Sequence, residues 1–205
     1  MVLTVKVIKE SSHDIVKLLI NQVGITVFSI VLYTAVNAID DEALLGKITV
    51  IISVFATVFY FALIYAAAWD FGARDKIRID SGNLERTQAK GALISFIANI
   101  PNFLLAFLAV ISILVFISCG SDGAYSAFSV INFLLGRTNA MFFGAIHGIF
   151  ASLKSNNEIY LLCQSVAYFI APIFTVTVTH LGYELGLREF RIFKLPLPRS
   201  PRRKK

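Results

Sequence analysis

Four long apolar runs, separated by shorter polar stretches, dominate this sequence. They extend over Leu19–Ala38, Ile48–Trp69, Gly91–Ile117 and Ile159–Leu181. Because an α-helix rises about 1.5 Å per residue, roughly 20 apolar residues cross a hydrocarbon core of about 30 Å. Each run meets that length. The pattern predicts an all-α polytopic membrane helix bundle with four transmembrane helices near 19–38, 48–69, 91–117 and 159–181.

Two shorter apolar runs lie between the third and fourth long runs, at 124–135 and 140–153. The residues 136–139 between them have the composition of a turn. Runs of this length are typical of interfacial or re-entrant helices rather than of spans. We expect a shallow pair of short outer helices at the membrane surface. A re-entrant hairpin and two short spans are the alternatives.

The distribution of basic residues predicts the orientation. Lys and Arg number 3, 1, 5, 2 and 8 in the five stretches 1–17, 39–47, 70–90, 118–158 and 187–205. Cytoplasmic loops of membrane proteins are enriched in Lys and Arg. The alternation predicts a multi-pass protein, most simply of the cell membrane, with both termini cytoplasmic. The chain then divides into a cytoplasmic segment (1–17), the bundle (18–186) and a basic cytoplasmic tail (187–205).

Composition agrees with a membrane protein. Hydrophobic residues make up 57% of the 205 residues and charged residues 16%, with a mean hydropathy of +0.73. The net charge of +6 is concentrated in the tail, beside a membrane helix. We therefore expect the tail to bind anionic lipid of the bilayer and not nucleic acid. The expected lipid-binding residues are Arg188, Arg191, Lys194, Arg202, Arg203, Lys204 and Lys205.

Motifs of the common enzyme classes do not occur in the sequence. His-Glu-x-x-His, Gly-x-Ser-x-Gly and the phosphate-binding loop are missing, and the long runs hold almost no acidic residues. Catalysis would need metal ligands, acids or an activated nucleophile. We expect no enzyme activity, no catalytic residue, no metal and no cofactor.

Polar residues among the apolar runs give two candidate ligand-binding groups. Asn99 and Asn102 share one face of the third run, and Pro101 between them removes a backbone donor. They predict either a notch that contacts a solute or a kink whose amides bond neighbouring helices. Arg137 lies between the two short runs. In a shallow pair it stays among headgroups, whereas in a re-entrant pair it would face an aqueous vestibule and favour anionic substrates.

Two ridges of small residues predict close helix packing, one on the second short run and one on the fourth long run. The expected packing residues are Ala140, Gly144, Gly148, Ala167, Ala171, Thr175, Gly182 and Gly186. The helix that they contact belongs either to this chain or to a partner, which includes a second copy of the chain. Trp69 is expected to anchor the membrane interface, and residues 70–75 to form a compact turn held by charges.

Two functional classes follow from these patterns. The first is a small transport-related or permease-like membrane component without catalytic activity, which uses the notch around Asn99 and the short outer pair. The second is a non-catalytic structural or regulatory subunit that packs against a partner membrane protein.

Overall fold

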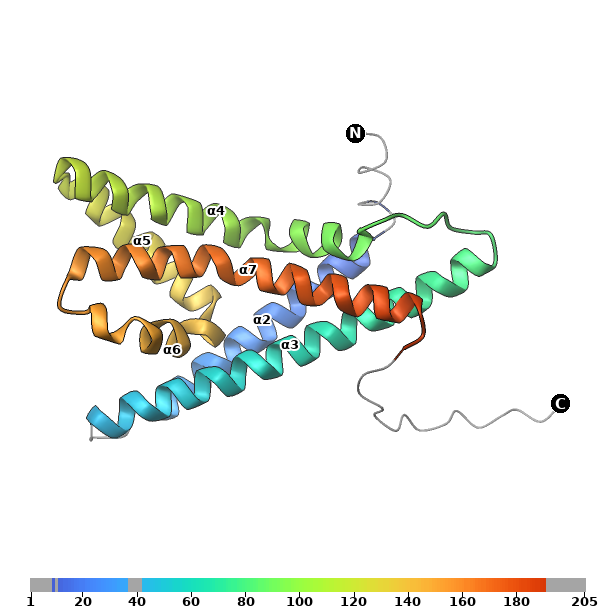
Figure 1. The fold of residues 1–205 in the computed structure, drawn as a ribbon, viewed down its shortest axis with the longest axis horizontal. Helices are drawn as coiled ribbons and strands as arrows, with labels where there is room; N and C mark the ends of the chain where they lie inside the picture. The colour runs from blue at the N-terminus through green and yellow to red at the C-terminus, as the bar shows by residue number, and fades with distance from the viewer. Residues whose placement is uncertain (1–8, 10, 37–41, 191–205) are drawn as a thin grey trace.

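The computed structural model describes residue 9 and residues 11–36 and 42–190, and these residues form an all-helical bundle. The helices are α2 (Ser12–Val36), α3 (Glu42–Asp80), α4 (Lys90–Cys119), α5 (Asp122–Thr138), α6 (Ala140–Ile149) and α7 (Asn157–Leu187), with a short 3₁₀ turn at Ala151–Leu153. The long helices α2, α3, α4 and α7 extend along the molecule, and α5 and α6 lie between them in one half of it (Figure 1).

Four of the described helices, α2, α3, α4 and α7, are long and apolar enough to cross a membrane. They contain the predicted spans, except that residues 37 and 38 lie outside the described residues. Their outward faces carry large apolar side chains, and Ile51, Val58, Phe107 and Phe174 are each more than half exposed. Soluble proteins rarely expose contiguous apolar surface of this kind. The helices therefore suggest a multi-pass membrane protein.

The compact turn expected at residues 70–75 is wrong, because α3 continues without interruption to Asp80. Gly72 looked like a turn residue in the sequence. In the structure it lies where a Cβ would collide with the carbonyl oxygen of Tyr183 on α7. Its missing side chain therefore permits a close helix contact and does not mark the end of the helix.

Helices α5 and α6 form a hairpin that is inserted between the long helices. The Thr26 hydroxyl, near the middle of α2, donates to the Thr138 carbonyl oxygen at 2.9 Å. The Ser53 and Thr57 hydroxyls of α3 donate to the Met141 carbonyl oxygen at 2.8 and 2.9 Å. A pair lying across the helix ends would not reach these residues. These contacts therefore favour the inserted hairpin, which was the alternative, over the expected shallow pair (Figure 1).

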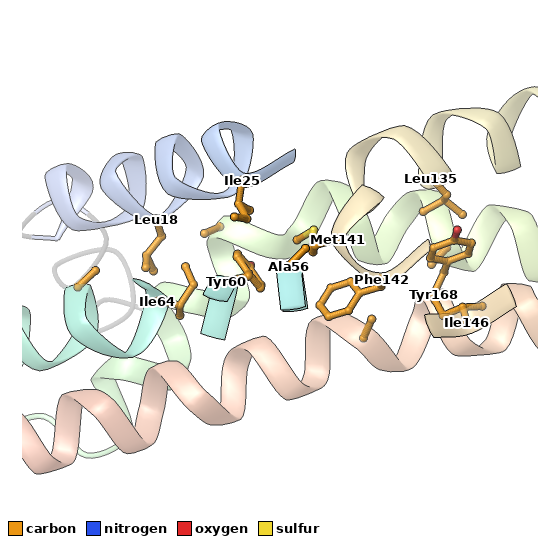
Figure 2. Close-up of a cluster of buried hydrophobic side chains, with 14 of the residues drawn as sticks. Leu18, Ile25, Ala56, Tyr60, Ile64, Leu135, Met141, Phe142, Ile146 and Tyr168 are labelled. Atoms are coloured by element: carbon orange, nitrogen blue, oxygen red, sulfur yellow. The ribbon is translucent and has the colours of Figure 1, made fainter. Parts of the chain in front are cut away.

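The hydrophobic core continues from the long helices into the hairpin. Figure 2 shows Ile25 of α2 and Tyr60 of α3 close to Met141 and Phe142 of α6. The rings of Tyr60 and Phe142 meet edge to face with centroids 6.0 Å apart. Since these side chains are buried in one cluster, the hairpin is an integral part of the core.

Candidate functional site

A cavity of about 570 Å³ lies at the end of the bundle where α2 ends and α3 and α7 begin, which we call the cavity end. Helices α2, α3 and α7 and both helices of the hairpin contribute to its wall. Its volume falls in the range of small-molecule sites, about 300–1,000 Å³. The polar side chains of the wall are Tyr33, Thr34, Thr49, Asn132, Arg137, His147, Tyr160 and Gln164.

Arg137 carries the only permanent charge among the residues that line this cavity. It lies in the last turn of α5, is exposed, and places its guanidinium carbon 5.0 Å from the centroid of the Phe133 ring. Within the described part of the chain it forms no ion pair. A guanidinium can donate two parallel hydrogen bonds to a carboxylate or a phosphate. An unpaired arginine at a cavity can therefore bind an anion.

Asn132, one turn before Gly136 on α5, adds a second binding group to the same wall. Its Oδ1 atom is buried, and no hydrogen-bond partner for it exists among the residues described. Buried polar atoms almost always have a partner. Water or a polar solute in the cavity would supply the missing donor.

His147 connects α6 to α7 in the cavity wall. Its Nδ1 atom contacts the Tyr160 hydroxyl, and its Nε2 atom lies 3.2 Å from the Gln164 amide nitrogen. Tyr160 and Gln164 are four residues apart on α7, so they share a helix face. The imidazole lies against the Phe143 ring, with centroids 4.1 Å apart. Each ring nitrogen therefore has a polar partner that belongs to the wall of the cavity.

The predicted notch in α4 does not join Arg137. Asn99 donates from Nδ2 to the Ser95 carbonyl oxygen at 2.9 Å, and Asn102 Nδ2 lies 3.4 Å from Asn99 Oδ1. Both asparagines are buried, and Pro101 lies within the continuous helix α4. The amides thus bond to each other and to the backbone of their own helix, away from the residues that line the cavity.

The small-residue ridge of α6 packs on α3. A Cβ on Gly144 would collide with the Thr49 carbonyl oxygen, and a Cβ on Gly148 would lie 2.6 Å from Cγ2 of Val50. Ala140, at the start of the ridge, is buried. The absence of a side chain at the two glycines is what lets α6 approach the α3 backbone.

The ridge of α7 also packs on α3. A Cβ on Gly186 would collide with the Trp69 carbonyl oxygen, and a Cβ on Gly182 would lie 2.9 Å from the Tyr65 carbonyl oxygen. The other ridge residues are buried or half-buried: Ala171, Thr175 and Ala167. Both ridges therefore contact a helix of this chain. A partner protein or a second copy stays a prediction that these residues do not support.

The opposite end of the bundle, where α2 and α4 begin and α3 and α7 end, is the ion-pair end. Lys90 Nζ of α4 lies 2.7 Å from Asp75 Oδ2 of α3, and both side chains are at most 5% exposed. The Tyr183 hydroxyl of α7 donates to the same carboxylate oxygen at 2.8 Å. One carboxylate thus joins three helices.

Further ion pairs tie the remaining helix and the connector to this end. Arg74 Nη2 of α3 lies 2.8 Å from Asp14 Oδ1 of α2, and Arg86 Nη2 lies 3.4 Å from Glu184 Oε2 of α7. Sequence reasoning used the basic residues of 70–90 as an orientation signal and for the charged turn expected at residues 70–75. Their acidic partners were missed, although Asp14 and Glu184 lie at the ends of the two runs that meet here.

The predicted lipid-binding residues are only partly described. Arg188 is exposed at the end of α7. The other members of the set lie outside the described residues: Arg191, Lys194, Arg202, Arg203, Lys204 and Lys205.

Comparison with known protein families, with curated proteins and with solved structures found no match. Function is therefore inferred from the residues of this chain alone. Sequence reasoning named Arg137 as a candidate ligand-binding residue and placed it at an aqueous vestibule only in the re-entrant alternative, and it did not name His147, Tyr160 and Gln164 as site residues. The spacing of Tyr160 and Gln164 on one polar helix face was the available signal.

Proposed function

We propose that the chain is a small transport-related membrane component, without catalytic activity, whose cavity receives a small anionic solute. The observation that carries the proposal is Arg137, which lines a cavity of about 570 Å³ and has no ion-pair partner in the described part of the chain. A charge within an apolar helical hairpin is costly unless a counter-charge or water reaches it. A solute carboxylate, sulfate or phosphate would supply the counter-charge and acceptor oxygens for the guanidinium.

In this proposal the four long helices span the cell membrane with both termini cytoplasmic, and the hairpin enters from the extracellular side without crossing. Non-helical backbone at membrane depth is tolerated where protein covers it or where it lines a water-filled cavity. The hairpin turn satisfies that condition, because Thr26, Ser53 and Thr57 donate to its carbonyl oxygens. Arg188 and the basic residues after it are proposed to contact anionic lipid.

Thiol labelling tests the orientation. Cys119 is exposed at the end of α4, on the cavity side, whereas Gly82 follows α3 at the ion-pair end. In a Cys163→Ser background, a membrane-impermeant maleimide should label Cys119 in intact cells. A Gly82→Cys variant that also carries Cys119→Ser should be labelled only after the membrane is opened. The reverse pattern would invert the proposed orientation.

Ligand stabilisation tests the solute site. The full-length chain in mild detergent is heated with acetate, benzoate or sulfate at constant ionic strength. A ligand that binds only the folded protein raises its melting temperature. We expect at least one anion to do so, and Arg137→Gln to remove the effect. Arg86→Gln, at the ion-pair end, is the matched control and should keep it. No stabilisation by any of the anions, or full stabilisation of Arg137→Gln, would contradict the proposal.

A structural or regulatory subunit is the second candidate function. The observation that favours it is an apolar groove of about 490 Å³ between α4 and α7, lined by Phe96, Phe103, Phe107 and Phe169 among other residues. In a bilayer either lipid chains or an apolar partner helix would cover it. Purification in mild detergent separates the two functions: a membrane protein that co-purifies in a fixed ratio supports the subunit, and a stabilising anion supports transport.

A further inference from the structure

The His147 imidazole contacts two groups that can each exchange the roles of donor and acceptor. A tyrosine hydroxyl can donate or accept, and a glutamine amide presents its NH₂ or its oxygen depending on its rotation. A neutral imidazole needs one donor and one acceptor, whereas a protonated imidazole needs two acceptors. Tyr160 and Gln164 can satisfy both states without any movement of the helices.

The position of the added proton follows from the orientation of the Gln164 amide. When its NH₂ group faces the ring, with the amide nitrogen 3.2 Å from Nε2, the neutral ring accepts at Nε2 and donates from Nδ1 to the Tyr160 oxygen, and the added proton binds to Nε2. A half-turn of the amide would bring Oε1 to the same place, where it accepts from a protonated Nε2. A histidine held by a backbone carbonyl would have one of its nitrogens fixed as a donor. Neither partner of His147 is a backbone group.

The charges around the ring oppose its protonation when no anion is bound. The charged and titratable groups around it are Arg137 from α5, Tyr33 from α2, Tyr160 and Tyr168 from α7 and Lys154 from the loop after α6. The lining residues that α3 contributes do not titrate, and none of the described lining residues is a carboxylate. A protonated ring would therefore add to an already positive wall. An anion at Arg137 reverses this, because it attracts a second positive charge across a site that water only partly screens.

We infer that His147 takes up one proton when an anion binds at Arg137, so that the cavity is a proton-coupled anion site. The inference rests on the proposed solute site and adds the ion that accompanies the solute. The proton comes from the aqueous phase at the cavity end, binds to Nε2, and leaves with the anion. Only this N–H bond forms and breaks.

Calorimetry of the full-length chain in detergent measures anion binding and proton uptake separately. Benzoate and sulfate are the probes, because both are fully ionised above pH 6. Each is titrated in buffers of different ionisation enthalpy, which yields the number of protons taken up per anion. We expect up to one proton, and up to tenfold tighter binding for each unit that the pH falls. Arg137→Gln should abolish binding.

His147→Gln keeps a polar side chain in the wall and should bind the anion without proton uptake and with no pH dependence. His180→Gln on α7, which is not among the cavity-lining residues, is the matched control and should keep both properties. Gln164→Leu removes the acceptor for the added proton and should lower the proton number while Arg137 is unchanged. Gln164→Leu also tests the proton uptake if His147→Gln does not fold.

The outcomes separate this inference from the proposed function. Anion binding by the parent chain without proton uptake would overturn the inference and leave the proposed solute site intact. Proton uptake that persists undiminished in His147→Gln would also overturn it. If neither probe binds to the parent chain at any pH, the solute site itself is refuted and the inference with it.

Discussion

The two ends of this bundle differ in whether their charged side chains have ion-pair partners. At the ion-pair end, Lys90 and Asp75 are buried together and Tyr183 completes the carboxylate's hydrogen bonding. At the cavity end, Arg137 lines the cavity and has no ion-pair partner within the described residues. A buried charge is tolerated when it is paired and hydrogen-bonded. The buried pair at the ion-pair end therefore holds helices together, whereas the guanidinium of Arg137 can bind an anion from outside the chain.

The hairpin at the cavity end is held by neutral contacts. Thr26, Ser53 and Thr57 bond to backbone carbonyl oxygens, and Gly144 lets α6 approach α3. Hydrogen bonds between neutral groups contribute about 1 kcal/mol each. The ion-pair end is therefore held by a buried ion pair, whereas the hairpin is held by neutral hydrogen bonds and close packing.

The largest effect is expected at Asp75. Asp75→Ala leaves the Lys90 ammonium buried without its carboxylate, and breaking a buried pair in this way costs about 3–5 kcal/mol. Unfolding in denaturant should show this loss, while Asp80→Ala, at the exposed end of the same helix, should change little. The double variant Asp75→Leu/Lys90→Met should recover much of the loss. If Asp75→Ala and Asp80→Ala were equally stable, the buried Lys90–Asp75 pair would not stabilise this end of the bundle.

A smaller loss is expected when the hairpin contact is disturbed. Gly144→Ala puts a methyl group against the Thr49 carbonyl oxygen, and overpacking of this kind costs about 1–3 kcal/mol. Gly24→Ala in α2 is the matched control, since a Cβ there meets nothing within 4 Å. Thermal unfolding in detergent should separate the two variants. If both behave like the parent chain, the hairpin is not docked on α3 as described.

Solvent exposure should reduce the contribution of an ion pair to the free energy of unfolding, even at the ion-pair end. Arg86 and Glu184 lie 3.4 Å apart, but the Arg86 side chain is 62% exposed. Exposed pairs contribute about 0–1 kcal/mol. Arg86→Ala should therefore destabilise the chain far less than Asp75→Ala in the same denaturant titration. A loss as large as that of Asp75→Ala would mean that pairing, and not burial, decides the energetics at this end.

The smallest effect on stability is expected at Arg137. Arg137→Ala and Arg137→Glu should both unfold within about 0.5 kcal/mol of the parent chain, because the side chain is exposed. Both should lose the stabilisation by anions. A severe loss of stability with Glu but not with Ala would show that the guanidinium lies in a buried anion site.

The sequence predicted the long helices because their length and apolarity are properties of single segments. It did not predict the depth of the hairpin, since Thr26, Ser53 and Thr57 meet its turn only after α2 and α3 have packed. The turn expected around Gly72 was wrong for a related reason. A glycine that permits a close contact with Tyr183 has the same local sequence signal as a glycine in a turn.

The candidate site also contains residues that the sequence could predict and residues that it could not. Arg137 was predictable, because it is the only charged residue between Asp122 and Lys154. His147 was not, because its partners Tyr160 and Gln164 belong to a different helix and approach it only in the folded chain. The amides of Asn99 and Asn102 show the converse. Polar residues that look available in the sequence are bonded to their own helix in the structure.

The position of the hairpin has a consequence for biosynthesis. Chains are made from the N-terminus, and early segments fold while later ones are still being added. Helices α2 and α3, which supply the hydroxyl donors for the hairpin turn, are therefore in place before α5 and α6 are made. Helix α7 comes last and packs through Gly182 and Gly186 on the part of α3 that the hairpin leaves uncovered. The order of synthesis thus matches the order in which each helix finds its docking surface.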